Sequence, residues 1–102
     1  LTSSVTVQGK LGFSGTAPGV SACGTGPLIT GSDSAGKVTI GTGATTSCTL
    51  TFSAAYAAAP ACTVIGNNSA ANLAATSSTT QLVFTSSADM ASYVVMYVCV
   101  GL

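Results

Sequence analysis

The sequence predicts an all-β fold, a small antiparallel β-sandwich or jelly-roll-like domain that we expect to work in a homo-oligomer. Three observations support this prediction. Apolar residues recur with a period of two, turn-forming Gly, Pro, Ser and Asn recur about every eight to twelve residues, and no stretch has a convincing helical pattern. Six to eight short strands with this punctuation are typical of sandwiches and barrels.

The first expected strand is short and lies around Val5 and Val7, where both residues alternate with Thr. The stretch from Gly15 to Gly26 is rich in glycine and contains Pro18, so we expect a loop there. Residues 28–30 resume an extended apolar pattern and predict the second strand.

The next elements form a predicted hairpin and the clearest strand of the chain. Residues 31–36 are Gly, Ser, Asp, Ser, Ala and Gly, a turn too long for a two-residue hairpin, and residues 37–40 return as a strand. Residues 48–52 alternate strictly, with Cys48, Leu50 and Phe52 on one face.

The Ala-rich run 54–59 suggests a helix by propensity, but it is short and precedes Pro60. We therefore expect a connecting loop or a single helical turn. Three further strands are expected at residues 61–65, 73–75 and 81–85.

The stretch 93–102 is apolar on both of its faces, with Tyr, Val and Cys on one and Val and Met on the other. Apolar residues on both faces indicate a strand that is covered on each side. This strand is therefore either central in a sheet or part of an oligomer interface.

The chain has very few charges. Its 102 residues include two Lys, two Asp and no Arg, Glu or His, so charged residues make up 4% of the sequence. Nucleic-acid binding is not expected without a basic patch, and acid–base catalysis, a metal or another cofactor is not expected without His or Glu. We therefore predict a protein that is not an enzyme.

No stretch predicts membrane insertion, because the longest apolar run covers about ten positions, against roughly 18 for a spanning helix. The net charge is zero, so charge repulsion gives little protection against association. A surface without edge charges predicts contacts with copies of the same chain.

The four cysteines, Cys23, Cys48, Cys62 and Cys99, are widely spaced and lack the CxxC pattern and the His of metal sites. We expect two structural disulfides formed in an oxidising place, with buried free thiols as the alternative. Cys62 and Cys99 lie in apolar strands, and Cys23 lies in a loop that can reach Cys48. These placements favour the pairs Cys23–Cys48 and Cys62–Cys99.

A set of motifs in a fixed order covers about residues 16–101. The motifs are Thr16-Ala17-Pro18, residues 21–24, residues 31–41, Ser47-Cys48-Thr49-Leu50-Thr51-Phe52, residues 59–64 and Tyr97-Val98-Cys99-Val100-Gly101. In this order they resemble a C-terminal β-domain of phage tail-fibre and tailspike-like proteins and of related bacterial surface proteins.

The resemblance implies a β-rich head, often trimeric, at the distal end of a fibre. Residues 1–15 are then the end of a stalk or an exchanged strand, and residues 16–102 are the head. The implied function is assembly and attachment to a host-surface glycan, as part of a virion tail or at an extracellular or cell surface.

Candidate site residues follow from these expectations. Tyr56 in a loop, with Asn67 and Asn68 at a loop tip, can contact sugar rings and hydroxyls, although a plain turn is the simpler explanation of the two amides. Residues 67–69 also match a glycosylation sequon. Asp33 and Lys37 are expected to form a turn with a surface ion pair.

The candidate interface residues are Val5, Val7, Tyr93 and Tyr97, which lie in the first and last expected strands. A core position is the alternative for the two tyrosines. A second hypothesis for the whole chain is a secreted bacterial or archaeal fibre subunit that polymerises through β-strand pairing or donation, with the first strand as donor.

Overall fold

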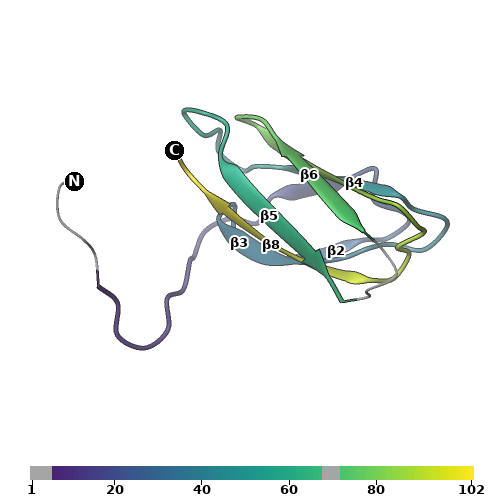
Figure 1. The fold of residues 1–102 in the computed structure, drawn as a ribbon, viewed down its shortest axis with the longest axis horizontal. Coiled ribbons are helices and arrows are strands. Elements are labelled where there is room, and N and C mark those ends of the chain that lie inside the picture. Colours follow the sequence, from purple (N-terminus) through teal and green to yellow (C-terminus); the bar gives the residue numbers. More distant parts are fainter. Residues whose placement is uncertain (1–5, 68–71) are drawn as a thin grey trace.

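Alternating apolar residues produce eight strands in the computed structural model, which describes residues 6–67 and 72–102 (Figure 1). The strands are β1 (Gly19–Ser21), β2 (Leu28–Gly31), β3 (Ala35–Thr39), β4 (Ser47–Thr51), β5 (Ala61–Gly66), β6 (Leu73–Ser77), β7 (Gln81–Ser86) and β8 (Val94–Val100). Within the described residues there is no helix. The all-β prediction is therefore confirmed.

The strands form two four-stranded sheets, in the orders β1-β4-β7-β6 and β2-β3-β8-β5. Every neighbouring pair is antiparallel. The arrangement is consistent with a β-sandwich, in which each sheet turns one face toward the other.

The inward faces of both sheets supply the core, as the period of two requires. In β4 the buried positions alternate with polar ones, in β7 Leu82 and Phe84 are buried on either side of the half-buried Val83, and in β8 the buried positions alternate with more exposed apolar ones. The buried apolar residues are Cys23, Val38, Ile40, Cys48, Leu50, Phe52, Leu82, Phe84, Met90, Val95, Tyr97 and Cys99.

The largest buried side chain, Tyr97, requires glycine on the neighbouring strand β3. Gly31, Gly36 and Tyr97 lie in register across β2, β3 and β8. A Cβ atom at Gly36 would lie 2.6 Å from the Tyr97 hydroxyl oxygen, whereas one at Gly31 would crowd the backbone of Ala35 and Gly36. Gly36 therefore leaves the space that the tyrosine ring occupies, and Gly31 allows β2 and β3 to approach each other closely.

Three sequence expectations differ from the structure in the first third of the chain. Val7 belongs to no strand, so the expected first strand is not formed within this chain, and Val5 lies outside the described residues. The loop expected from Gly15 to Gly26 contains β1, which pairs with β4 through only three residues and has no sequence signal. The turn between β2 and β3 comprises only residues 32–34, because Gly31 and Gly36 pair across it.

The other expected strands are present, with bounds shifted by one or two residues. The Ala-rich run 54–59 is a loop, as expected. β8 is central in its sheet, between β3 and β5, but this chain covers only one of its faces. The second apolar face therefore needs another explanation.

Candidate functional site

The outer face of the sheet β2-β3-β8-β5 is the main exposed apolar surface of the two sheets. Val98 and Val100 of β8 are 44% and 59% exposed, and Ile65 on the neighbouring strand β5 is 62% exposed. Ile65 pairs in register with Met96, which is 43% exposed. We call the outward residues of β8 the β8 stripe; they are Val94, Met96, Val98 and Val100.

The outer face of the other sheet is different. Its two central strands, β4 and β7, expose Thr51 and Thr85, with Thr49 and Val83 half-buried beside them. The two sheets have the same number of strands and come from the same low-charge sequence. The apolar outer face is therefore a local property of the sheet that contains β8.

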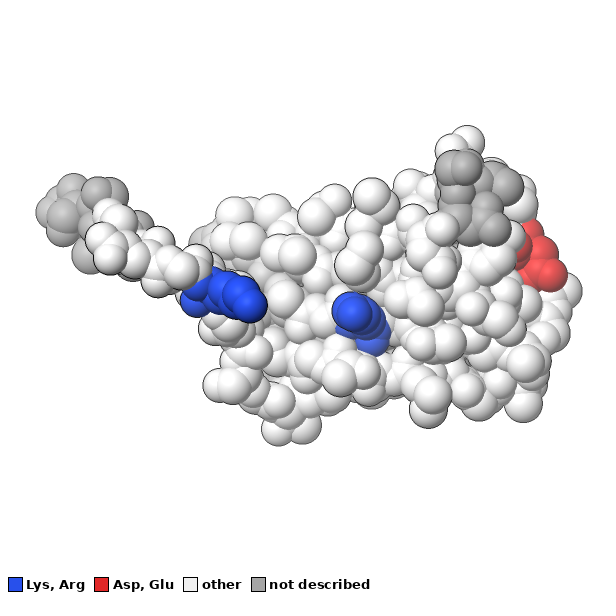
Figure 2. All heavy atoms as spheres, turned by 90° about the horizontal axis from the view of Figure 1, so that it is seen from below, with Lys and Arg blue, Asp and Glu red and all other residues white. Residues whose placement is uncertain are grey.

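Charge is sparse around the β8 stripe. Lys37 is exposed on β3 and pairs in register with Met96. Figure 2 shows one side of the molecule, on which two blue lysine groups and one red acidic group are the coloured exceptions on a white surface. A surface of this kind has little electrostatic selectivity.

An N-terminal arm, which we define as residues 6–14, precedes the sheets. Figure 1 shows this part of the chain extending away from the strands. Val7, Leu11 and Phe13 in the arm are 48%, 64% and 53% exposed. All three have the same parity in sequence, so a fully extended arm would present them on one side, but Gly9 has a φ of 89° and bends the chain between Val7 and Leu11.

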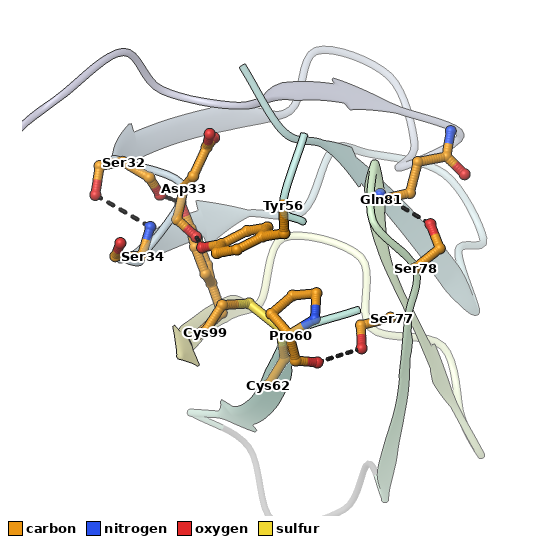
Figure 3. Close-up of a disulfide and its surroundings, with 11 residues drawn as sticks. Ser32, Asp33, Ser34, Tyr56, Pro60, Cys62, Ser77, Ser78, Gln81 and Cys99 are labelled. Carbon is orange, nitrogen blue, oxygen red and sulfur yellow. Dashed lines mark hydrogen bonds between the residues drawn. A yellow bond between two sulfur atoms is a disulfide. The ribbon is translucent and has the colours of Figure 1, made fainter. Parts of the chain in front are cut away.

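Tyr56 lies beside the disulfide between Cys62 and Cys99 (Figure 3). Its hydroxyl group donates a hydrogen bond of 3.0 Å to the Asp33 carbonyl oxygen, and its ring makes an edge contact with Phe52, with centroids 4.9 Å apart. The Tyr56 ring is therefore half-buried, and one edge of it helps to close the core.

The Asp33 carboxylate anchors the loop that contains Tyr56. It accepts hydrogen bonds from the amide and hydroxyl groups of Ser53, at 2.8 and 2.9 Å, and from the Ala54 amide at 3.1 Å. These contacts replace the ion pair with Lys37 that the sequence suggested. They hold the Ser53–Ala54 backbone against the β2–β3 turn.

Asn67 lies at the other end of the sheet from Tyr56. Its side-chain oxygen accepts a 3.1 Å hydrogen bond from the Val94 amide, at the start of β8, whereas Tyr56 lies near Gly101, after the end of β8. A strand of seven residues spans about 20 Å, so the two residues do not share a sugar-binding site. Asn68 lies outside the described residues.

Both expected disulfides are present. Cys23 is joined to Cys48, and Cys62 is joined to Cys99. The first bond fixes the β1–β2 connection to β4, and the second joins neighbouring strands of one sheet. Two disulfides are compatible with an extracellular protein.

The two tyrosines expected at an interface face the core instead. Tyr93 is half-buried against the core, and Tyr97 is 1% exposed and donates a 2.6 Å hydrogen bond to the Ser32 carbonyl oxygen. Burial, with a smaller effect of the Asp33 charge, raises the pKa of Tyr97 to about 12. The interface prediction for Tyr97 is therefore wrong, because its side chain is enclosed within one chain.

The two aspartates hold loops at opposite ends of β3. Asp33 precedes β3, whereas Asp89 accepts hydrogen bonds from the amides of Thr45 and Ala91, beyond its other end. These backbone hydrogen bonds lower the pKa of Asp89. The separation leaves the two carboxylates too far apart to act as a catalytic pair.

Within residues 6–67 and 72–102 no group of three or more Cys, Asp, Glu or His side chains is arranged to hold a metal ion. The same residues include no helix of the length and hydropathy needed to cross a membrane.

The sequence predicts that the last strand is apolar on both faces, but the interface residues expected on it, Tyr93 and Tyr97, lie on the covered face and not on the outer one. The outward face of this strand could have been predicted from Cys99, because a disulfide-bonded cysteine is usually buried. Tyr93, Val95 and Tyr97 have the same parity as Cys99, so a buried disulfide turns them inward and turns Met96 and Val98 outward. Comparison with protein-family models, with curated proteins and with solved structures found no match.

Proposed function

We propose that this chain is a non-enzymatic structural and adhesion domain. In this proposal it is the homotrimeric head of a fibre of the phage tail-fibre or tailspike kind, part of a virion tail or exposed outside the cell, and acts in assembly and attachment. The observation that supports the proposal most is the apolar outer face of the sheet that contains β8. A monomer would expose this face to water.

The assembly part of the proposal follows from that face and from the net charge. Large apolar patches that remain exposed in a single chain mark contact surfaces. A net charge of zero gives little repulsion between copies that approach one another. Copies of the same chain are therefore the partners we propose.

The mass of the purified chain under native conditions tests the assembly. A closed trimer supports the fibre head. A monomer at tens of micromolar would contradict self-assembly altogether.

The attachment part follows from the resemblance and from Tyr56, whose half-buried ring lies in a loop rich in small residues. Binding to a glycan array tests it. We expect Tyr56→Ala to abolish binding and Tyr56→Phe, which keeps the aromatic ring, to retain most of it. If both variants still bind, Tyr56 is not part of the binding site. If the wild type binds no glycan, the proposed function is assembly alone.

The second candidate function is a secreted bacterial or archaeal fibre subunit that polymerises through a donated strand. The specific observation in its favour is the N-terminal arm, which exposes Val7, Leu11 and Phe13 and pairs with no strand of its own chain. Electron microscopy separates the two candidates. Open-ended filaments of the purified chain would favour this second function over the closed trimer.

A further inference from the structure

We infer that the N-terminal arm of one copy lies along the β8 stripe of a neighbouring copy. This inference rests on the proposed self-assembly and names the surfaces that make the contact. Of the interface residues expected from the sequence, the inferred contact includes Val7 but not Tyr93 or Tyr97.

The two surfaces match in pattern. The β8 stripe presents four apolar side chains at every second residue, from Val94 to Val100. Once straightened at Gly9, where the free arm bends, the arm would present Val7, Leu11 and Phe13 at the same spacing, with Gly9 between Val7 and Leu11. Each run covers six residue steps, or about 20 Å of extended chain, so the two stripes are equally long.

The residues beside the C-terminal half of the β8 stripe are small. On β5 the outward neighbours of Val98 and Val100 are Thr63 and Ala61, and on β3 the neighbour of Val98 is Ala35. The two alanines are smaller than valine, and threonine is about the same size. The Val98 and Val100 side chains are therefore open to contact from an extended chain.

Charge favours the arm over a contact between two identical faces. Lys37 lies beside Met96, so two copies that met face to face would enclose two lysines and no carboxylate. Enclosing an unpaired ammonium group is costly. In the arm, Lys10 has the opposite parity to Leu11, so it points away from the face when Leu11 points toward it.

Within a single chain the arm does not cover its own β8 stripe, since Leu11 and Val98 both remain exposed. A contact between the arm of one copy and the β8 stripe of the next joins two different surfaces. Such a contact closes into a ring when the rotation between copies permits, and otherwise continues as a filament. The same contact therefore suits the closed trimer and the open fibre.

The test uses the full chain with substitutions on each surface and a matched control for each. Leu11→Asp with Phe13→Asp removes the apolar side of the arm, and Gln8→Asp adds a charge on its other side. Val98→Asp adds a charge to the β8 stripe, and Thr85→Asp adds one to the outer face of the other sheet. At a fixed protein concentration we expect the arm variant (Leu11→Asp with Phe13→Asp) and Val98→Asp each to form at least tenfold less oligomer than the wild type. The controls Gln8→Asp and Thr85→Asp should form as much oligomer as the wild type.

Mixing the two deficient variants gives the most specific outcome. The arm variant keeps an intact β8 stripe and the Val98→Asp variant keeps an intact arm, so the mixture should form a 1:1 complex that neither variant forms alone. A mixture that stays monomeric would overturn the inference. Val100→Asp, at a more exposed position, replaces Val98→Asp if that variant fails to form its two disulfides.

The failure of this inference is distinguishable from the failure of the proposed function. A wild-type chain that is monomeric contradicts both. A wild-type oligomer that persists in the arm variant or in Val98→Asp contradicts the inference alone and points to another contact, such as pairing of sheet edges.

Discussion

Tyr97 shows at the scale of a single residue how this low-charge chain fixes its core. Its ring fills the space over Gly36, and its hydroxyl group donates a hydrogen bond to the carbonyl oxygen of Ser32, a residue that is 4% exposed. The side chain is therefore both the largest apolar unit of the core and the partner of a buried polar atom.

Replacing Tyr97 with Phe keeps the ring and removes that hydrogen bond. The Ser32 carbonyl oxygen then has lost its hydroxyl partner, so we expect the free energy of unfolding to fall by about 1–2 kcal/mol. Urea unfolding at neutral pH measures the loss. An unchanged midpoint would show that the hydrogen bond does not contribute.

The same substitution changes the response to alkaline pH. A tyrosine in the unfolded chain ionises near pH 10, whereas the pKa of Tyr97 in the folded protein is about 12. The unfolded chain therefore binds fewer protons between these values, and stability should fall as pH rises from 10 to 12. Thermal melts of both proteins across this range should show a smaller loss for Tyr97→Phe, and equal losses would contradict the assigned cause.

At the scale of an element, the β2–β3 hairpin depends on glycine for close approach. A Cβ atom at Gly36 would crowd the Tyr97 hydroxyl group and the Thr30 carbonyl oxygen, whereas one at Gly19 in β1 would meet no atom within 4 Å. We expect Gly36→Ala to reduce the free energy of unfolding by about 1–3 kcal/mol. Gly19→Ala is the control and should change it by less than about 0.5 kcal/mol; equal effects would contradict the packing argument.

The disulfide between β5 and β8 closes a loop of the chain with a sequence separation of 37 residues. Removing it with Cys62→Ala and Cys99→Ala frees the unfolded chain, which costs about 4 kcal/mol in the chain-entropy model. That loss is close to the whole stability of a small domain. Urea midpoints of the oxidised wild type and the variant measure it, and similar midpoints would show that strand pairing alone holds β5 to β8.

The element scale also shows what sequence reasoning can and cannot predict. β4 alternates strictly between inward apolar and outward polar residues, and in β7 Leu82 and Phe84 share one face, so their positions and inward faces follow from the pattern. β1 consists of Gly, Val and Ser inside a glycine-rich stretch, and only its partner strand β4 defines it. Val7 has a strand-like pattern but no partner within the chain, because pattern alone does not provide a neighbouring strand.

At the scale of the whole molecule, the candidate surface was only half predictable. The sequence indicates that β8 is apolar on both faces, which is correct, and that such a strand is central or lies at an interface. It does not indicate which face the other sheet covers. That choice depends on how the two sheets pack, and the aromatic residues, which are the usual interface anchors, lie on the covered side.

The two methionines of the chain provide the most direct test of whether copies of the chain cover this face. Met90 is 0% exposed in the single chain and Met96 is 43% exposed, so Met90 is an internal control for a buried side chain. Oxidation by hydrogen peroxide, followed residue by residue with peptide mass spectrometry, reports the exposure of each. We expect both methionines to be protected at concentrations where the chain is assembled, and Met96 alone to become reactive on dilution. Rapid oxidation of Met96 at every concentration, with Met90 still reduced, would contradict assembly through the β8 stripe.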